Sequence, residues 1–123
     1  MTETAVKLSA GFSVADADQP CLSLDDNELV VAFREWTEDE IELRFLECYA
    51  VRWQAVITRR NNLACDEVYE VRNSAWLALH RSEGAIEVGE PQRHFRLNFN
   101  AWGQLDVLAG RMELAQRKSA SVP

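Results

Sequence analysis

Three kinds of side chain in this 123-residue chain could carry chemistry: a nucleophilic serine or cysteine, a metal-binding set, and paired carboxylates. Ser74 comes directly before a short apolar stripe, where a serine is expected to cap a helix rather than to act as a nucleophile. Cys48 alternates with the apolar face of a predicted strand and lies on the same side as Arg52, and a nearby cation can lower the pKa of a thiol. A half-buried cysteine that packs as a small hydrophobe is the favoured interpretation, so we predict no catalytic residue.

The histidines and cysteines show no metal-binding spacing. Cys65, His80 and His94 are far apart in the sequence and could meet only through tertiary folding. We expect His80 to be a structural residue on a short helix, and His94 to begin the polar face of a strand in contact with solvent. The five glycines are scattered singly, so the chain has no glycine-rich phosphate loop. We therefore predict neither a metal nor another cofactor.

Carboxylates are gathered in one part of the sequence. Residues 16–42 hold ten acids and a single base, Arg34, within a chain of formal net charge −7. Glu38, Asp39 and Glu40 are consecutive, but they fall in a predicted turn, which lacks the burial that raises a carboxyl pKa for acid–base catalysis. Such a surface disfavours nucleic acid and anionic membranes as partners and favours a basic protein. The alternative is a solvated acidic face that only keeps the protein soluble.

Two tryptophans fall at predicted turns rather than inside strands. We interpret Trp102 as covering the end of a sheet. Trp36 is flanked by Glu35 and Glu38, and an aromatic side chain ringed by acids suits the capture of a basic surface. The residues expected to contact such a partner are Asp25, Asp26, Glu28, Glu35, Trp36, Glu38, Asp39, Glu40 and Glu42.

The elements that must position these side chains are mostly strands. The segment from His94 to Leu108 has the alternation of a β-hairpin. The expected register pairs Phe99 with Leu105. It also pairs Leu97 with Val107. The face expected to be buried carries Phe95, Leu97, Phe99, Leu105 and Val107.

Further strands are expected at residues 21–24, 29–33, 41–53 and 67–72. The longest of them should bend or bulge near Glu47, which falls on the apolar side of the pattern. Residues 15–20 are expected to form a polar loop. One short helix is predicted over about residues 74–83, with Ser74 as its N-cap and Gly84 as its stop.

These elements predict an α+β, mostly β fold, a strongly bent antiparallel sheet or sandwich of six or more strands with one short helix. We expect a single domain over residues 1–123, with a frayed tail at 118–123. The odd number of cysteines suits reduced thiols in the cytoplasm. No run approaches the ~20 apolar residues of a membrane-spanning helix. Strand order and oligomeric state do not follow from the sequence.

A recognisable pattern is formed by residues 69–77, 94–100 and 105–109, with 31–34, 43–45 and 49–52 upstream. This pattern resembles small bacterial proteins of the polymorphic-toxin immunity type. The resemblance implies a cytoplasmic protein that binds a cognate toxin domain and occludes its active site. Many such toxins carry basic sites for nucleic acid or nucleotides, which an acidic partner could fill. The acids of residues 16–42 are not part of the pattern, so their contact role is our inference from charge.

Two other classes of function remain open. A small-ligand carrier or enzyme built in the curved sheet needs an apolar cavity with a few converging polar groups, and a lining by Arg44, Arg52 or His94 would favour it. A homodimeric adaptor would instead present an exposed apolar patch or an open strand edge.

Overall fold

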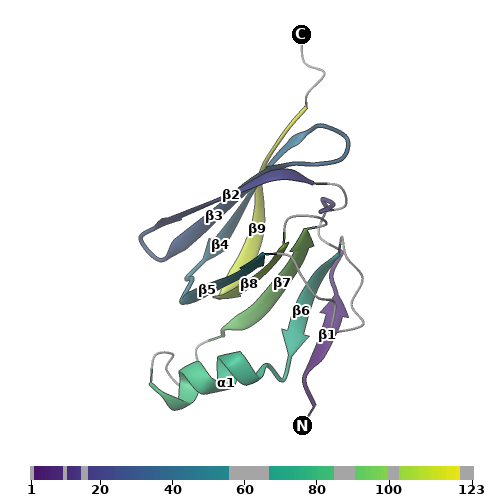
Figure 1. Ribbon diagram of the computed structural model, residues 1–123. Coiled ribbons are helices and arrows are strands. Elements are labelled where there is room, and N and C mark those ends of the chain that lie inside the picture. The colour runs from purple at the N-terminus through teal and green to yellow at the C-terminus, as the bar shows by residue number, and fades with distance from the viewer. Residues whose placement is uncertain are drawn as a thin grey trace.

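The computed structural model describes residues 2–9, 11–14, 17–55, 67–84, 91–99 and 103–119. These residues form nine strands and one helix in two antiparallel sheets (Figure 1). The elements are β1 (Thr4–Lys7), β2 (Asp18–Asp25), β3 (Glu28–Arg34), β4 (Glu40–Leu46), β5 (Ala50–Ala55), β6 (Val68–Arg72), α1 (Ala75–Ser82), β7 (Arg93–Phe99), β8 (Gly103–Ala109) and β9 (Arg111–Lys118). The predicted α+β, mostly β fold with a sandwich of six or more strands is confirmed.

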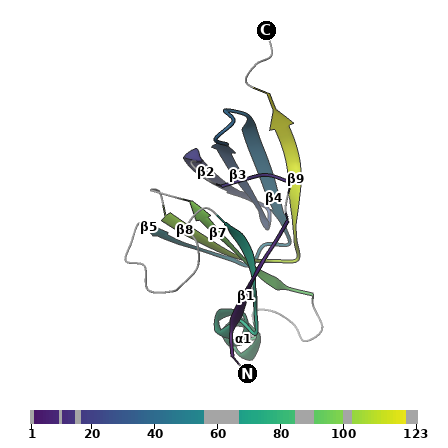
Figure 2. The same cartoon turned by 90° about the vertical axis from the view of Figure 1, so that its right-hand side faces the viewer.

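The two sheets are joined through bent strands. Sheet A has the order β1-β6-β7-β8-β5, and sheet B has the order β2-β3-β4-β9. The chain passes from β4 into β5 and returns from β8 into β9, so two neighbouring pairs of strands bend through one corner (Figure 2). In sheet B, β3 and β2 lie beyond β4 on the side away from β9. In sheet A, β5, which continues β4, is the last strand beside β8. The outer strands β2 and β5 therefore lie on the same side of the molecule.

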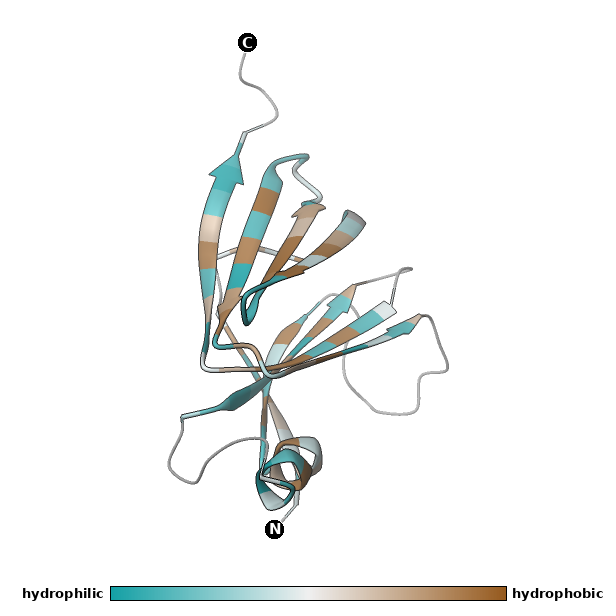
Figure 3. Ribbon diagram, turned by 90° about the vertical axis from the view of Figure 1, so that its left-hand side faces the viewer, coloured by the Kyte–Doolittle hydropathy of each residue, from teal (hydrophilic) through white to brown (hydrophobic). Residues whose placement is uncertain are grey.

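The core lies between the inner faces of the two sheets. Apolar and polar residues alternate along the strands (Figure 3), and the apolar set of β3 and β4 is buried. Aromatic rings join the sheets edge to face, with ring centroids 5.3 Å apart for Phe33 and Phe99 and 5.6 Å apart for Phe45 and Phe95. The core therefore ties both sheets to the corner that they share.

The β7–β8 hairpin has the predicted buried face but not the predicted register. The observed pairs are Phe99 with Gly103, Leu97 with Leu105 and Phe95 with Val107. The pairing is thus shifted by two residues from the expected one. A shift of two leaves every side chain on the same face, which is why the alternation alone does not reveal it.

Gly103 begins β8 at a position that only glycine fits. Its φ is +147°, and a side chain there would collide with the backbone carbonyl of Gln54 and the ring of Trp53 on β5. The close approach of β5 therefore sets where β8 can start. The turn before it, with Asn100 and Trp102, lies outside the described residues, and so does the predicted role of Trp102.

The predictions for the other elements are partly confirmed. The bend at Glu47 is confirmed, because this exposed residue has a φ of +53° between β4 and β5. The helix is confirmed with Ser74 as its N-cap. The predicted tail begins too early, at residue 118, because Lys118 still pairs with Glu40 as the last residue of β9. β9 is mostly exposed, so it lacks the apolar alternation of a buried strand.

The polar loop expected at residues 15–20 is also partly wrong. β2 already begins at Asp18, and its pairing with β3 is irregular between Asp18 and Cys21. Pro20 lies within this irregular start, which explains why the sequence there is typical of a loop. No helix among the described residues is long and apolar enough to cross a membrane.

Candidate functional site

A buried polar network lies on sheet A beneath α1. Its centre is the fully buried carboxylate of Asp106 on β8. Oδ1 of Asp106 accepts hydrogen bonds from His94 Nε2 at 2.6 Å and from Arg96 Nε at 2.8 Å. Oδ2 accepts from Gln104 at 3.0 Å and lies 3.6 Å from a guanidinium nitrogen of Arg52. Burial by itself raises the pKa of Asp106, but the hydrogen bond from His94 and the charge of Arg96 outweigh it and hold that pKa below 3.8.

The network continues from His94 into the first turn of α1. The backbone N–H of Leu77 donates to Ser74 Oγ at 3.1 Å, and the same hydroxyl lies 2.7 Å from His94 Nδ1. A hydroxyl that donates to Nδ1 requires the imidazole tautomer with its proton on Nε2, the nitrogen that faces Asp106. Trp76 packs edge to face on His94 with 5.2 Å between ring centroids, and Arg52 lies over Trp76 at 4.4 Å. The prediction that His94 contacts solvent is therefore wrong, since α1 and Trp76 cover it.

The serine, histidine and aspartate of this network are the residue types of a hydrolytic triad, but the serine and the aspartate contact the opposite nitrogens of the histidine. In a serine hydrolase the serine faces Nε2 and the carboxylate faces Nδ1 of the histidine. Here Ser74 faces Nδ1 and Asp106 faces Nε2. Ser74 Oγ also holds the Leu77 N–H as a helix cap. The arrangement therefore suits fastening α1 to sheet A.

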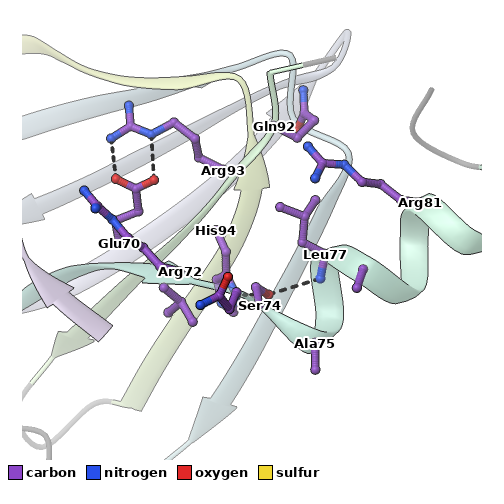
Figure 4. A pocket seen from close by; sticks show the side chains of 12 residues that line it. Glu70, Arg72, Ser74, Ala75, Leu77, Arg81, Gln92, Arg93 and His94 are labelled. Atoms are coloured by element: carbon purple, nitrogen blue, oxygen red, sulfur yellow. Dashed lines mark hydrogen bonds and ion pairs between the residues drawn. The ribbon is translucent and has the colours of Figure 1, made fainter. Parts of the chain in front are cut away.

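A pocket of about 720 Å³ opens next to this network, between α1 and the strands β6 and β7 (Figure 4). Its charged lining includes Arg72, Arg81 and Arg93, with Glu70 as the acid among them. Glu70 and Arg93 form a two-fold ion pair at 2.8 and 3.1 Å, and the hydrogen bond from Arg93 lowers the pKa of Glu70 below 4.5. Gln92 also lines the pocket, and its buried Oε1 has no partner within the described part of the chain.

The acidic residues predicted to bind a partner lie at two ends of sheet B instead of forming one cluster. Asp25 and Asp26 are exposed at the β2–β3 turn. Glu28 and Glu42 lie on β3 and β4, where both pair with Arg44 at 3.1 and 3.4 Å. The length of β3, seven residues or about 20 Å, separates Asp25, Asp26 and Glu28 from the β3–β4 turn. Glu42 lies nearer to that turn, where it pairs with Ala32.

Glu35, at the start of the β3–β4 turn, is buried and cannot serve as a contact. Its carboxylate accepts hydrogen bonds of 2.8 Å each from Arg117, from the backbone N–H of Ser13 and from the Thr37 hydroxyl. Burial raises the pKa of Glu35, while these three donors lower it, and the balance leaves it below 4.5. The carboxylate thus fastens the turn from inside.

The outward residues of the same turn remain available to a partner. Trp36 is 61% exposed, and Glu38 and Glu40 are exposed as well. Asp39 is partly covered, because its carboxylate pairs with Arg117 at 2.8 Å. The predicted contact set at this end of the sheet is therefore reduced to Trp36, Glu38 and Glu40, with Asp39 contributing to the structure of the turn.

Cys48 is not an activated thiol. It is 8% exposed, and burial raises its pKa above 9.0. Its Sγ lies 3.8 Å from the carbonyl of Ala50, whereas Arg52 is engaged with Trp76 and Asp106. The expected small-hydrophobe role is the one that the structure supports.

Two features of the structure have no signal in the sequence that would predict them. Leu22 and Leu24 on β2 are large apolar side chains that remain exposed. Their alternation with Cys21 and Ser23 predicted a strand, but only the sheet order places that strand at an edge. The pairing of Arg117 with Glu35 joins residues 82 positions apart, a separation that no local pattern signals.

Within the described residues no group of three or more His, Cys, Asp or Glu could hold a metal ion, and Cys65 lies outside them. His80 is half-buried on α1 and packs against Trp76 at 5.7 Å. No family model, curated protein or solved structure matches this chain.

Proposed function

We propose that this chain is a cytoplasmic protein-binding protein of the immunity or inhibitor type, and that it neutralises a toxin domain by occluding a basic surface. The β3–β4 turn carries the proposal. It presents the exposed Trp36 beside Glu38 on a backbone that Glu35 and Arg117 hold from inside. A large aromatic side chain with few rotatable bonds, on a backbone that is already held in place, loses little entropy on binding, which favours it as a binding hot spot.

The charge of the chain supports a basic partner. Its formal net charge is −7. Exposed acids lie at both ends of sheet B, with Asp25 and Asp26 at one end and Glu38 and Glu40 at the other. A field of this sign attracts a basic protein and can raise its association rate by roughly 10- to 1,000-fold at low salt.

The first test is to search the genes beside this one for a toxin domain and to co-express that domain with this chain. Cells that produce the toxin domain should grow only when they also produce this chain. Trp36→Ala should weaken the purified complex by about 10- to 100-fold, measured by calorimetry, because a hot-spot tryptophan is lost. Full protection and unchanged affinity in the Trp36→Ala variant would contradict the proposal.

The second test asks whether the acids of the β3–β4 turn attract the partner, or whether the net charge of the whole chain is enough. Glu38→Lys/Glu40→Lys should lower the association rate at low salt, whereas Glu83→Lys/Glu113→Lys makes the same change in net charge elsewhere and should lower it less. Asp39 is left unchanged because its ion pair with Arg117 supports the turn. Equal effects of the two double variants would remove the turn from the interface.

A second candidate is the binding of a small polar ligand in the pocket between α1, β6 and β7. The observation in its favour is that Ser74, Gln92 and His94 converge there with three arginines in a volume of about 720 Å³. A fragment library screened by NMR should then shift the amide signals of Ser74 and Gln92. Hits that shift only other surfaces would speak against this candidate.

A further inference from the structure

The β2 edge of sheet B exposes apolar side chains that belong to the inner face of the sandwich. Leu22 pairs with Val31 and Leu24 pairs with Leu29, and both of these partners are buried. Leu22 itself is 38% exposed and Leu24 is 64% exposed. On β5, the outer strand of sheet A on the same side, Trp53 is 36% exposed although it pairs with the buried Leu105 of β8. Within the described part of the chain, the sandwich is open along this side.

The same two leucines direct backbone groups toward the free edge. Asp26 and Asn27 in the β2–β3 turn have φ values of 47° and 63°, which are typical of a two-residue type I′ turn. The two residues that flank such a turn exchange both of their backbone hydrogen bonds. Alternation along β2 then points the N–H and C=O groups of Leu22 and Leu24 away from β3. Among the described strands β2 pairs only with β3, so these groups lie at an open edge.

The charges along β2 favour a basic partner over a second copy of this chain. Asp18 and Asp25 stand at the two ends of the strand. Antiparallel self-pairing centred on Leu22, which joins the outward backbone groups of both copies, would bring Asp18 of each copy close to Asp25 and Asp26 of the other. Like charges that lie close together across paired strands are destabilising. Asp18 pairs with Arg34, so the turn that carries Trp36 follows at this end of the edge. The apolar edge thus runs between the two acidic ends of sheet B.

We propose that the partner adds an extended strand to β2 along Cys21–Asp25, with apolar side chains alternating with basic ones. The apolar side chains pack beside Leu22, Leu24 and Trp53 on the inner face. The basic side chains lie on the outer face, where Asp25 stands. Pro20 and the irregular pairing at the start of β2 confine the added strand to the second half of β2. The inference rests on the proposed function, because it specifies how the same basic partner docks.

The test uses hydrogen exchange of the full chain with a short synthetic peptide of alternating valine and lysine. The amides of Leu22 and Leu24 should exchange about tenfold more slowly or better with the peptide bound. A matched peptide, N-methylated so that the edge facing β2 carries no donors, should give no protection. A peptide with glutamate in place of lysine should not bind. Protection by the N-methylated peptide, protection confined to other strands, or no binding of the valine–lysine peptide would each overturn the inference.

Two variants serve as matched probes. Leu24→Glu makes the protein more acidic but disrupts the apolar edge, so it should abolish the protection. Leu114→Glu adds the same charge at another exposed leucine, on β9, and should bind the peptide as the wild type does. If the protein forms a dimer without peptide, and the amides of Leu22 and Leu24 are already protected in it, a second copy is the occupant and the inference is overturned. A toxin complex that survives Leu24→Glu but not Trp36→Ala would refute only the docking mode and leave the proposed function standing.

Discussion

At the scale of single residues, Asp106 is the polar side chain whose loss should cost most stability. Its buried carboxylate accepts hydrogen bonds from His94, Arg96 and Gln104. Asp106→Ala leaves the charge of Arg96, 11% exposed, without its partner. We therefore expect a loss of about 3–5 kcal/mol in the free energy of unfolding, measured by urea titration. The exposed Glu40→Ala should change it by at most about 0.5 kcal/mol. Similar effects of the two substitutions would contradict a central role for Asp106.

Residue chemistry also predicts how stability depends on pH. The pKa values of Asp106, Glu35 and Glu70 all lie below their ordinary values of 3.8 and 4.5. A carboxyl group whose pKa is lower in the folded state stabilises the fold above its unfolded pKa. That stability is lost as the pH falls through the folded pKa. The free energy of unfolding should therefore fall steadily from roughly pH 5 to pH 3. Urea titrations across this range check the prediction, and Asp106→Asn should show a shallower loss.

At the scale of elements, α1 depends on one serine for both its start and its attachment. Ser74 caps the Leu77 N–H and contacts His94. Ser74→Ala should lower the free energy of unfolding by about 1–3 kcal/mol, since it removes a cap and a buried hydrogen bond. The amides of α1 should exchange faster, whereas those of β3 should not. Ser74→Thr keeps the hydroxyl and should restore most of the loss, and failure of this rescue would argue against the capping role.

The elements also differ in how far the sequence specifies them. α1 could be predicted because its signals, Ser74 before it and Gly84 after it, are local. The buried face of β7 and β8 could be predicted from alternation, but their register depends on how closely β5 approaches Gly103. β9 could not, because a mostly exposed strand carries no apolar pattern.

The polar network illustrates why a site is harder to predict than a strand. Ser74, His94 and Asp106 come from the start of α1, from β7 and from β8. Each is a polar residue at a position where solvent contact is the ordinary expectation. Only the packing of Trp76 over His94 makes the position buried, and this contact depends on where α1 lies on sheet A. The acidic turns differ from this network, because the strand predicted at residues 29–33 already separates them. The burial of Glu35 against Arg117 could not be predicted, since the two residues are 82 positions apart.

At the scale of the whole molecule, the bent sandwich turns one acidic segment into two separate acidic ends. Consecutive antiparallel strands reverse direction, so the β2–β3 turn and the β3–β4 turn lie at opposite ends of sheet B. The outer strand β2 spans the distance between these ends. An apolar edge flanked by carboxylates has the arrangement of a protein interface, with an apolar centre and a polar rim.

This arrangement predicts opposite effects of salt on two kinds of association. At low ionic strength the acids at the ends of β2 repel a second copy, so sedimentation should show a monomer. At about 1 M salt the Debye length falls to ~3 Å, and screening should allow some pairing of exposed β2 edges. Leu24→Glu should suppress that pairing. The complex with a basic partner should weaken over the same salt range. Dimers that form at low salt and dissociate at high salt would show that attraction between unlike charges joins the copies, contrary to the charge layout of β2.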